Sequence, residues 1–341
     1  MSSGACTGSW LDGNGGVFVA GIGLHPYQFP SETPYTVLGL TAVRAALADA
    51  GLAWPQVQSA YVGTTSIGMA AGRVMLRHLG STGLAVTQVE NASASGSFAF
   101  RQACMEIALG ASDVVLAMGV DKHGDGRRAA NKDGLERLSD TATIPAVKFA
   151  MMARSYLRAR GSGIEAMAEV AVKNHGNASL NPYAQFRKPR TLAQVLASPK
   201  VVGDLTVQQC CPRGEGAAAV LLVSGNALRR LGLDPRRCPQ VHASAANSER
   251  DEQRYGDGAV ELVGSSAQAA LAQAGIAATA LDLLELHDAF SVEELLYSEA
   301  IGVCSPGEGA AYLARGDSRI GGRCAINASG GLIGMGHPLG P

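Results

Sequence analysis

The sequence predicts an α/β protein made of two successive copies of one strand–helix pattern. Short apolar runs alternate with helical segments along most of the 341 residues, and the alternation starts again near residue 240. This order indicates β-α-β units and a largely parallel sheet. The 43 glycines and the aromatic share of only 5% are typical of small side chains that pack closely and are joined by many turns.

The first copy is expected in the amino-terminal part of the chain. A helix that opens at Pro34 has apolar residues at helical spacing, among them Val37, Leu38 and Val43, and it stops at Gly51. The other elements follow from the same criteria. They are strands at 16–23, 60–64, 84–90, 113–118 and 217–223, and helices at 71–79, 94–109 and 226–231.

The second copy is expected from residue 240 onward. Its strands are predicted at 240–246, 281–286 and 324–328, and its helices at 260–274 and 292–301.

A polar and basic insert, residues 121–200, is expected to hang from the first copy. It is largely helical, with a helix at 165–174, and it has 14 Lys and Arg against seven Asp and Glu. A positive surface of this kind suits a phosphorylated small molecule. A solvated helical excursion without a ligand is the alternative reading.

The charge and the motifs that are missing exclude several classes of protein. A net charge of −1 argues against a chain that coats nucleic acid or an anionic membrane. The apolar runs are far shorter than the roughly 20 residues that span a bilayer. The first 43 residues hold no Lys or Arg, so a secretory or transit peptide is not expected. Seven cysteines without CxxC or HExxH spacing predict reduced thiols, a cytoplasmic location and no metal site.

Four motifs, taken in order along nearly the whole chain, carry a resemblance to a known family. They are VENASASGS at 89–97; KNH, NPYAQF, QCCP and EGAAA between 173 and 219; HDAF at 287–290; and NASGG at 327–331 followed by GHPLG at 336–340. Together they resemble the thiolase superfamily and, more narrowly, its sterol-carrier/lipid-transfer thiolase branch.

The resemblance implies a five-layered α-β-α-β-α fold with two βαβαβαββ halves and a loop domain inserted in the first. Residues 1–120 and 201–232 would form the N-terminal half, residues 121–200 the loop domain, and residues 233–341 the C-terminal half. The family pattern continues with a helix, closing strands and a CxG motif beyond Pro341, so this half is expected to be incomplete. A homodimer or tetramer is implied, with a partner subunit as a further possibility.

The resemblance also implies a coenzyme A thioester as substrate, with no permanently bound cofactor. Where the family has its nucleophilic cysteine, this chain has Ser93. A serine hydroxyl at a helix N-terminus stays protonated unless a base is adjacent, and His337 is the candidate base. The alternative reading of Ser93 is a small polar residue that caps the following helix; Ser95 is a weaker candidate nucleophile.

Two histidines are the stronger candidates for catalysis. His287 follows a predicted buried strand at its carboxyl end, where open α/β sheets bind ligands, and His337 lies in a glycine-rich turn. Imidazoles can hydrogen bond to a thioester oxygen as it becomes an enolate, and they move protons near neutral pH. By resemblance, the candidate substrate-binding residues beside them are Asn327, Ser329, Gly330 and Gly331.

Three functions are consistent with these residues. The first is thiolase-type acyl transfer, which makes or cleaves a carbon–carbon bond next to a thioester and is altered here by the serine. The second is an aldolase or lyase that cleaves an acyl-CoA without a covalent intermediate. The third is a non-catalytic paralogue that binds acyl-CoA or lipid.

Overall fold

A computed structural model describes residues 9–122, 145–248 and 258–341. Its largest element is a five-stranded sheet with the order β1-β7-β4-β2-β3. The strands are β1 (Val17–Gln28), β2 (Ser59–Gly63), β3 (Ala85–Val89), β4 (Val114–Asp121) and β7 (Glu215–Ser224). Strands β2, β3 and β4 are parallel, whereas β7 is antiparallel to both of its neighbours. Four of the five strands therefore run in one direction, and the expectation of a largely parallel sheet fails only at β7, which runs against them.

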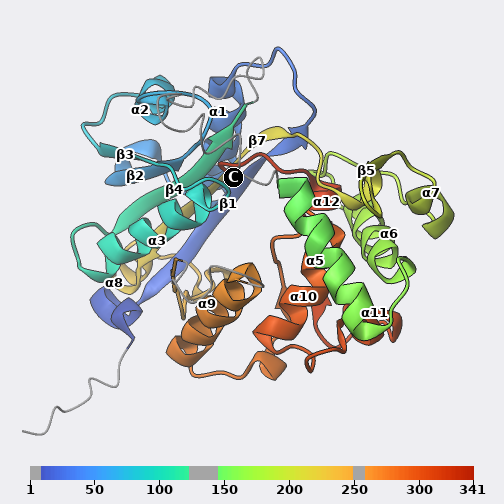
Figure 1. Ribbon diagram of the computed structural model, residues 1–341. Coiled ribbons are helices and arrows are strands. Elements are labelled where there is room, and N and C mark those ends of the chain that lie inside the picture. Colours follow the sequence, from blue (N-terminus) through green and yellow to red (C-terminus); the bar gives the residue numbers. More distant parts are fainter. Residues whose placement is uncertain (1–8, 123–144, 249–257) are drawn as a thin grey trace, which may run out of the picture.

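Helices cover both faces of this sheet (Figure 1). Strand β4 is buried along its whole length, and its side chains alternate between two cores. Leu116 packs on the side of α1 and Val115 on the side of α3. Helix α1 ends at Gly51 in the left-handed conformation, as predicted. The helices of this half are α1 (Tyr35–Ala50), α2 (Ala71–Leu76), α3 (Ser95–Ala108) and α8 (Gly225–Arg230).

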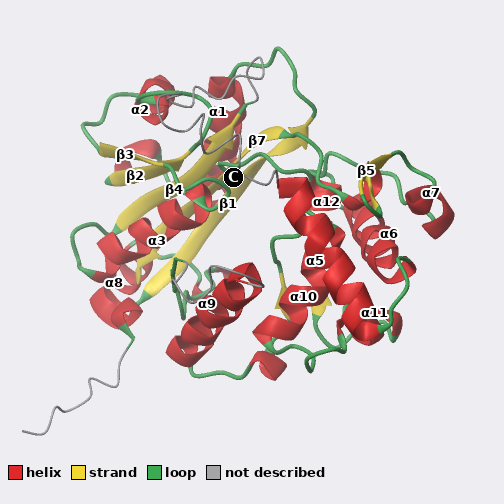
Figure 2. Cartoon of the chain, viewed as in Figure 1, coloured by secondary structure: helices red, strands yellow, loops and turns green. Residues whose placement is uncertain are grey.

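The insert is mostly helical in the part that the structure describes; residues 123–144 lie outside that part. Its long helices pack against α10 (Ser291–Ile301) from the carboxyl-terminal part of the chain, as Figure 2 also shows. The domain boundaries stay a prediction. The elements here are α5 (Pro145–Arg160), α6 (Glu165–Leu180), α7 (Leu192–Leu196), β5 (Lys200–Val202) and β6 (Leu205–Thr206).

The second copy is less regular than predicted. Instead of a strand at 240–246, the described segment has an isolated bridge between Phe18 and Gln240, because it touches the edge of β1 and then leaves it. Among the residues described in this part of the chain, only β8 (Leu283–Leu284) and β9 (Ala325–Ile326) form a sheet, and they are parallel. The helices are α9 (Gly258–Ala274), α10, α11 (Gly309–Ala314) and α12 (Gly331–Met335). None of the helices within the described ranges is long and apolar enough to cross a bilayer.

The carboxyl-terminal segment runs back to the sheet of the first half (Figure 1). A Cβ atom added at Gly119, on β4, would lie 2.1 Å from the carbonyl oxygen of Gly340, and one added at Gly96 would lie 2.5 Å from it. A Cβ at Gly340 would itself lie 2.7 Å from the carbonyl oxygen of Gly63. Glycine is therefore required at these places so that the two backbones can touch.

Candidate active site

The turn between β3 and α3 presents Ser93 at its exposed tip. Ala92, just before it, has a left-handed φ of 46°. The buried Ser95 holds the turn, because its hydroxyl accepts from the Asn91 N–H at 2.9 Å and donates to the Ala92 carbonyl at 2.7 Å. The N-cap of α3 is Ala94, without a side-chain cap bond. The helix-cap reading of Ser93 is therefore wrong, and Ser95 has a structural role.

Three predicted residues from distant parts of the sequence come together at this turn. The Oγ of Ser93 lies 3.4 Å from Nε2 of His337. The rings of His337 and His287 have centroids 5.3 Å apart and are nearly perpendicular, at 83°. A hydroxyl and two imidazoles thus face one small volume at the carboxyl end of β3, where sheets of this class bind ligands.

The ring of His287 is oriented by a buried carboxylate that the sequence analysis did not single out. Its Nδ1 lies 2.9 Å from Oε1 of Glu293. The second oxygen of Glu293 accepts from the Phe290 N–H at 2.8 Å and so caps α10. Acidic residues in a predicted first helical turn are usually exposed caps, which is why the pattern by itself did not reveal this contact.

Asp288, which follows His287 in the sequence, connects the two histidine loops, that is, the loop that carries His287 and the segment 331–337 that ends at His337. Its carboxylate is fully buried and accepts from the Leu332 N–H at 2.5 Å and from Asn174 Nδ2 at 2.7 Å. Burial, and after it the nearby negative charge of Glu294, raises the pKa of Asp288. A Cβ at Gly331 would stand 2.4 Å from this carboxylate. Asp288 thus holds the start of α12, the helix that leads to His337.

A buried ion pair lies beneath these loops and was also not predicted. Lys173 Nζ is 3.0 Å from Oε1 of Glu294, with both side chains no more than 3% exposed. The other oxygen of Glu294 accepts from Asn174 Nδ2 at 3.0 Å and from Asn327 Nδ2 at 3.3 Å. Lys173 also donates to the Ile326 carbonyl. The cluster joins α6, α10 and the residues after β9.

The predicted substrate-binding turn makes internal contacts. Asn327 is buried with φ 53°, and its Oδ1 accepts from the Leu286 N–H at 2.9 Å. The hydroxyl of Ser329 donates to Glu285 at 2.6 Å. Gly330 lies against α6, because a Cβ there would be 2.5 Å from that of Ala178. A contact of this turn with substrate stays a prediction.

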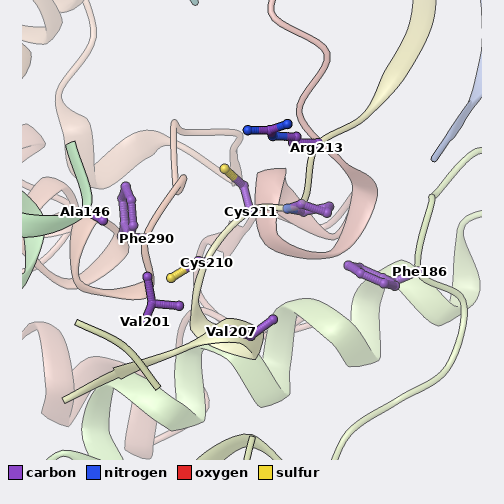
Figure 3. A pocket seen from close by; sticks show the side chains of 9 residues that line it. Ala146, Phe186, Val201, Val207, Cys210, Cys211, Arg213 and Phe290 are labelled. Atoms are coloured by element: carbon purple, nitrogen blue, oxygen red, sulfur yellow. The ribbon is translucent and has the colours of Figure 1, made fainter. Parts of the chain in front are cut away.

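An apolar cavity of about 610 Å³ has in its wall residues that contact the segments carrying His287 and His337. Arg213, on its wall, forms an isolated β-bridge with His337, and the Cys211 N–H donates to the Ala289 carbonyl at 2.8 Å. In Figure 3 the sulfurs of Cys210 and Cys211 lie between the rings of Phe290 and Phe186. The lining residues are Ala146, Phe186, Val201, Val207, Cys210, Cys211, Pro212, Arg213 and Phe290.

The adjacent cysteines of this wall are free thiols rather than a disulfide. Burial raises the pKa of both Cys210 and Cys211 to about 12, so they are protonated at neutral pH and poor nucleophiles. No cluster of His, Cys, Asp and Glu suited to a metal ion occurs in the described part of the chain.

Two family models match the chain, "Thiolase, N-terminal domain" over residues 28–195 and "Thiolase C-terminal domain-like" over residues 244–341. The chain is 36% identical to sterol carrier protein 2 of Gallus gallus over 95% of its own length but only 63% of that protein's length. It is 34% identical to the benzoylsuccinyl-CoA thiolase subunit BbsB of Thauera aromatica, covering 95% of this chain and 85% of that protein.

Solved structures agree with this fold. An Ltp2-ChsH2(DUF35) aldolase superposes with a TM-score of 0.79 and 27% identity, covering 94% of this chain and 85% of that one. Human mitochondrial 3-ketoacyl-CoA thiolase in complex with CoA gives a TM-score of 0.70 at 19% identity, covering 98% and 89%, and thereby shows the fold alone. The predicted thiolase-like fold is confirmed, and the chain belongs to the thiolase superfamily, in its sterol-carrier/lipid-transfer branch.

Proposed function

We propose that this protein makes or cleaves a carbon–carbon bond next to the thioester of an acyl-coenzyme A. The observation that carries the proposal is the convergence of His287, His337 and Ser93 beside an apolar cavity. His287 and His337 would donate to the thioester oxygen while it carries enolate charge, and they would move the protons of the reaction.

An aldolase-type cleavage needs no acylated residue. A base removes the proton of a 3-hydroxyl group, the bond between C2 and C3 breaks, and the electron pair passes into the thioester as an enolate. A carbonyl compound leaves, and C2 of the enolate then takes a proton. The similarity to a structure described as an aldolase, at 27% identity and a TM-score of 0.79, favours this version.

Thiolase-type acyl transfer is the second candidate, and one contact favours it. His337 Nε2 lies 3.4 Å from Ser93 Oγ, close to the reach at which a base can take a hydroxyl proton. Acyl transfer to serine is expected to be slow, because the hydroxyl is a weak nucleophile without full deprotonation.

Purified protein incubated with 3-hydroxyacyl-CoA and 3-oxoacyl-CoA, with products resolved by mass spectrometry, tests the proposal. Cleavage that survives in S93A and is lost in H287A supports the aldolase version. Loss in S93A, or a gain of thiolase activity in S93C, supports acyl transfer. Binding of acyl-CoA with no turnover by wild type or S93C would favour the non-catalytic alternative.

The assembly and the substrate contacts belong to the same proposal. Strand β3 is at the edge of the sheet with mostly exposed side chains, which supports pairing with a second copy in a homodimer or tetramer. A different partner chain is a further option. Two similar proteins support it, because one is named as the thiolase subunit BbsB and the other as the Ltp2-ChsH2(DUF35) aldolase. We propose no permanently bound cofactor, substrate contacts from Asn327, Ser329, Gly330 and Gly331, and a cytoplasmic location.

A further inference from the structure

We infer that Glu293 is a positioning residue that sets the tautomer of His287 and thereby turns the Nε2 lone pair of that ring toward the substrate. The inference rests on the proposed role of His287 in catalysis. Its own basis is the geometry of the pair: Nδ1 of His287 lies 2.9 Å from Oε1 of Glu293.

The Glu293 carboxylate is placed so that it accepts a hydrogen bond from Nδ1–H of the His287 ring. Its side chain is 1% exposed, and its second oxygen is already bound by the Phe290 N–H at 2.8 Å. Within the ranges that the structure describes, no Lys or Arg forms an ion pair with Glu293, whereas its neighbour Glu294 is paired with Lys173. His287 is thus the one basic side chain that meets this buried charge in those ranges.

A carboxylate beside Nδ1 selects the tautomer that carries the proton on Nδ1. Nε2 then keeps its lone pair and can accept a proton. The resulting imidazolium is stabilised by the same carboxylate, and its Nε2–H is the group that would then donate to the thioester oxygen. The His287 side chain is 41% exposed, so substrate and solvent can reach it. The base of the reaction would therefore be prepared by a residue that never touches the substrate.

Other titratable groups face this pair from each neighbouring element. They are His337 after α12, Asp288 in the same loop, Cys211 before β7 and Tyr297 on α10. The partner of Nδ1 is Glu293, and the carboxylate of Asp288, the residue next to His287, is bound by Leu332 and Asn174. Burial and then Glu293 itself raise the pKa of Tyr297, so the phenol stays protonated.

The decisive test is a long-range 1H–15N spectrum of histidine-labelled protein, with the signals of His287 assigned from their absence in H287N. Wild type is expected to show the Nδ1–H form, and E293Q the Nε2–H form. Glutamine can still cap α10 through its amide oxygen, while its NH₂ group donates to Nδ1 and reverses the tautomer. E299Q, the same change on the same helix but at a carboxylate paired with Arg160, serves as control and should leave the tautomer unchanged.

In the assay of the proposed reaction, kcat of E293Q is expected to fall about 10²-fold or more with little change in KM, because the base is lost while the binding surface remains. An Nε2–H form in wild type, or an unchanged tautomer in folded E293Q, would overturn the inference. The wild-type spectrum decides the matter even if E293Q does not fold. A reversed tautomer with an unchanged rate would instead count against the proposed role of His287, so the two failures are distinguishable.

Discussion

The contact between the glycines of the first half and the carboxyl-terminal segment makes a sharp prediction for G119A. The added Cβ would stand 2.1 Å from the carbonyl oxygen of Gly340, whereas separations below 3.0 Å essentially never occur for a real Cβ. Backbone must therefore move by roughly 1 Å, since both surfaces are main chain and no flexible side chain can yield. Gly340 is three residues beyond His337, so the shift is expected to reach this histidine, which we propose to be catalytic.

Two magnitudes follow from that displacement. Forcing a methyl group into a packed contact costs about 1–3 kcal/mol of the free energy of unfolding. A misplacement of about 1 Å at a reacting group can lower the rate by about 10²-fold. The first is measured by urea unfolding of G119A and wild type, and the second by kcat in the proposed bond-cleavage assay.

The matched control is G176A, the same substitution in the interior of α6. No atom comes within 4 Å of a Cβ placed there. The free energy of unfolding of G176A is therefore expected to exceed that of wild type by about 0.5–1 kcal/mol, because alanine loses less conformational entropy in a helix than glycine. A G119A protein with wild-type unfolding midpoint and wild-type rate would refute the reasoning, since the carboxyl-terminal segment could not then be packed against β4.

Three further predictions concern the buried polar groups. K173M leaves the carboxylate of Glu294 without its cation and should lower the free energy of unfolding by about 3–5 kcal/mol; a loss below 1 kcal/mol in urea unfolding would contradict a buried pair. N327A should cost about 2–4 kcal/mol, because alanine tolerates the left-handed φ of 53° poorly, the Leu286 N–H loses its acceptor and Glu294 loses a donor; N327G removes the same two hydrogen bonds without the backbone strain and should be less damaging, and equal losses would argue against backbone strain. Burial lowers the pKa of His175 from 6.5 to about 4, so the unfolded chain binds a proton between these values while the folded one does not. Stability is then complete above pH 6.5 and declines as the pH falls toward 4, by about 2 kcal/mol at pH 5. H175N should lose this part of the pH dependence. If the free energy of unfolding changed with pH by the same amount in H175N and wild type between pH 5 and 8, His175 could not be its source.

The regular elements of the first half could be predicted because their patterns are local. The spacing of apolar residues after Pro34 and the glycine at 51 define α1 without any tertiary information. Strand direction is different. An apolar run such as that in β7 reads the same whether its neighbours are parallel or antiparallel, so the expectation of a largely parallel sheet failed there.

The helices predicted at 260–274 and 292–301 are present as α9 and α10, whereas the strands of the second half were predicted too long, for a related reason. The segment at 240–246 has strand-like residues, but a strand exists only where a partner offers hydrogen bonds, and β1 offers them just at Gln240. In the same way, β8 is two residues long instead of six, because within the described ranges its only partner is the equally short β9.

Sequence alone determined which polar side chains are candidates for catalysis: Ser93, His287 and His337 stand in motifs whose residue types limit the chemistry. Tertiary structure decided which carboxylates serve them. Glu293 and Glu294 are adjacent in one acidic helical turn, yet one faces His287 and the other Lys173. Helical periodicity directs neighbouring residues to different sides, but only the packing of α10 against α6 and the histidine loops determines what lies on each side. Burial then requires that each carboxylate is met by hydrogen-bond donors, because an unpaired charge in the interior costs too much free energy.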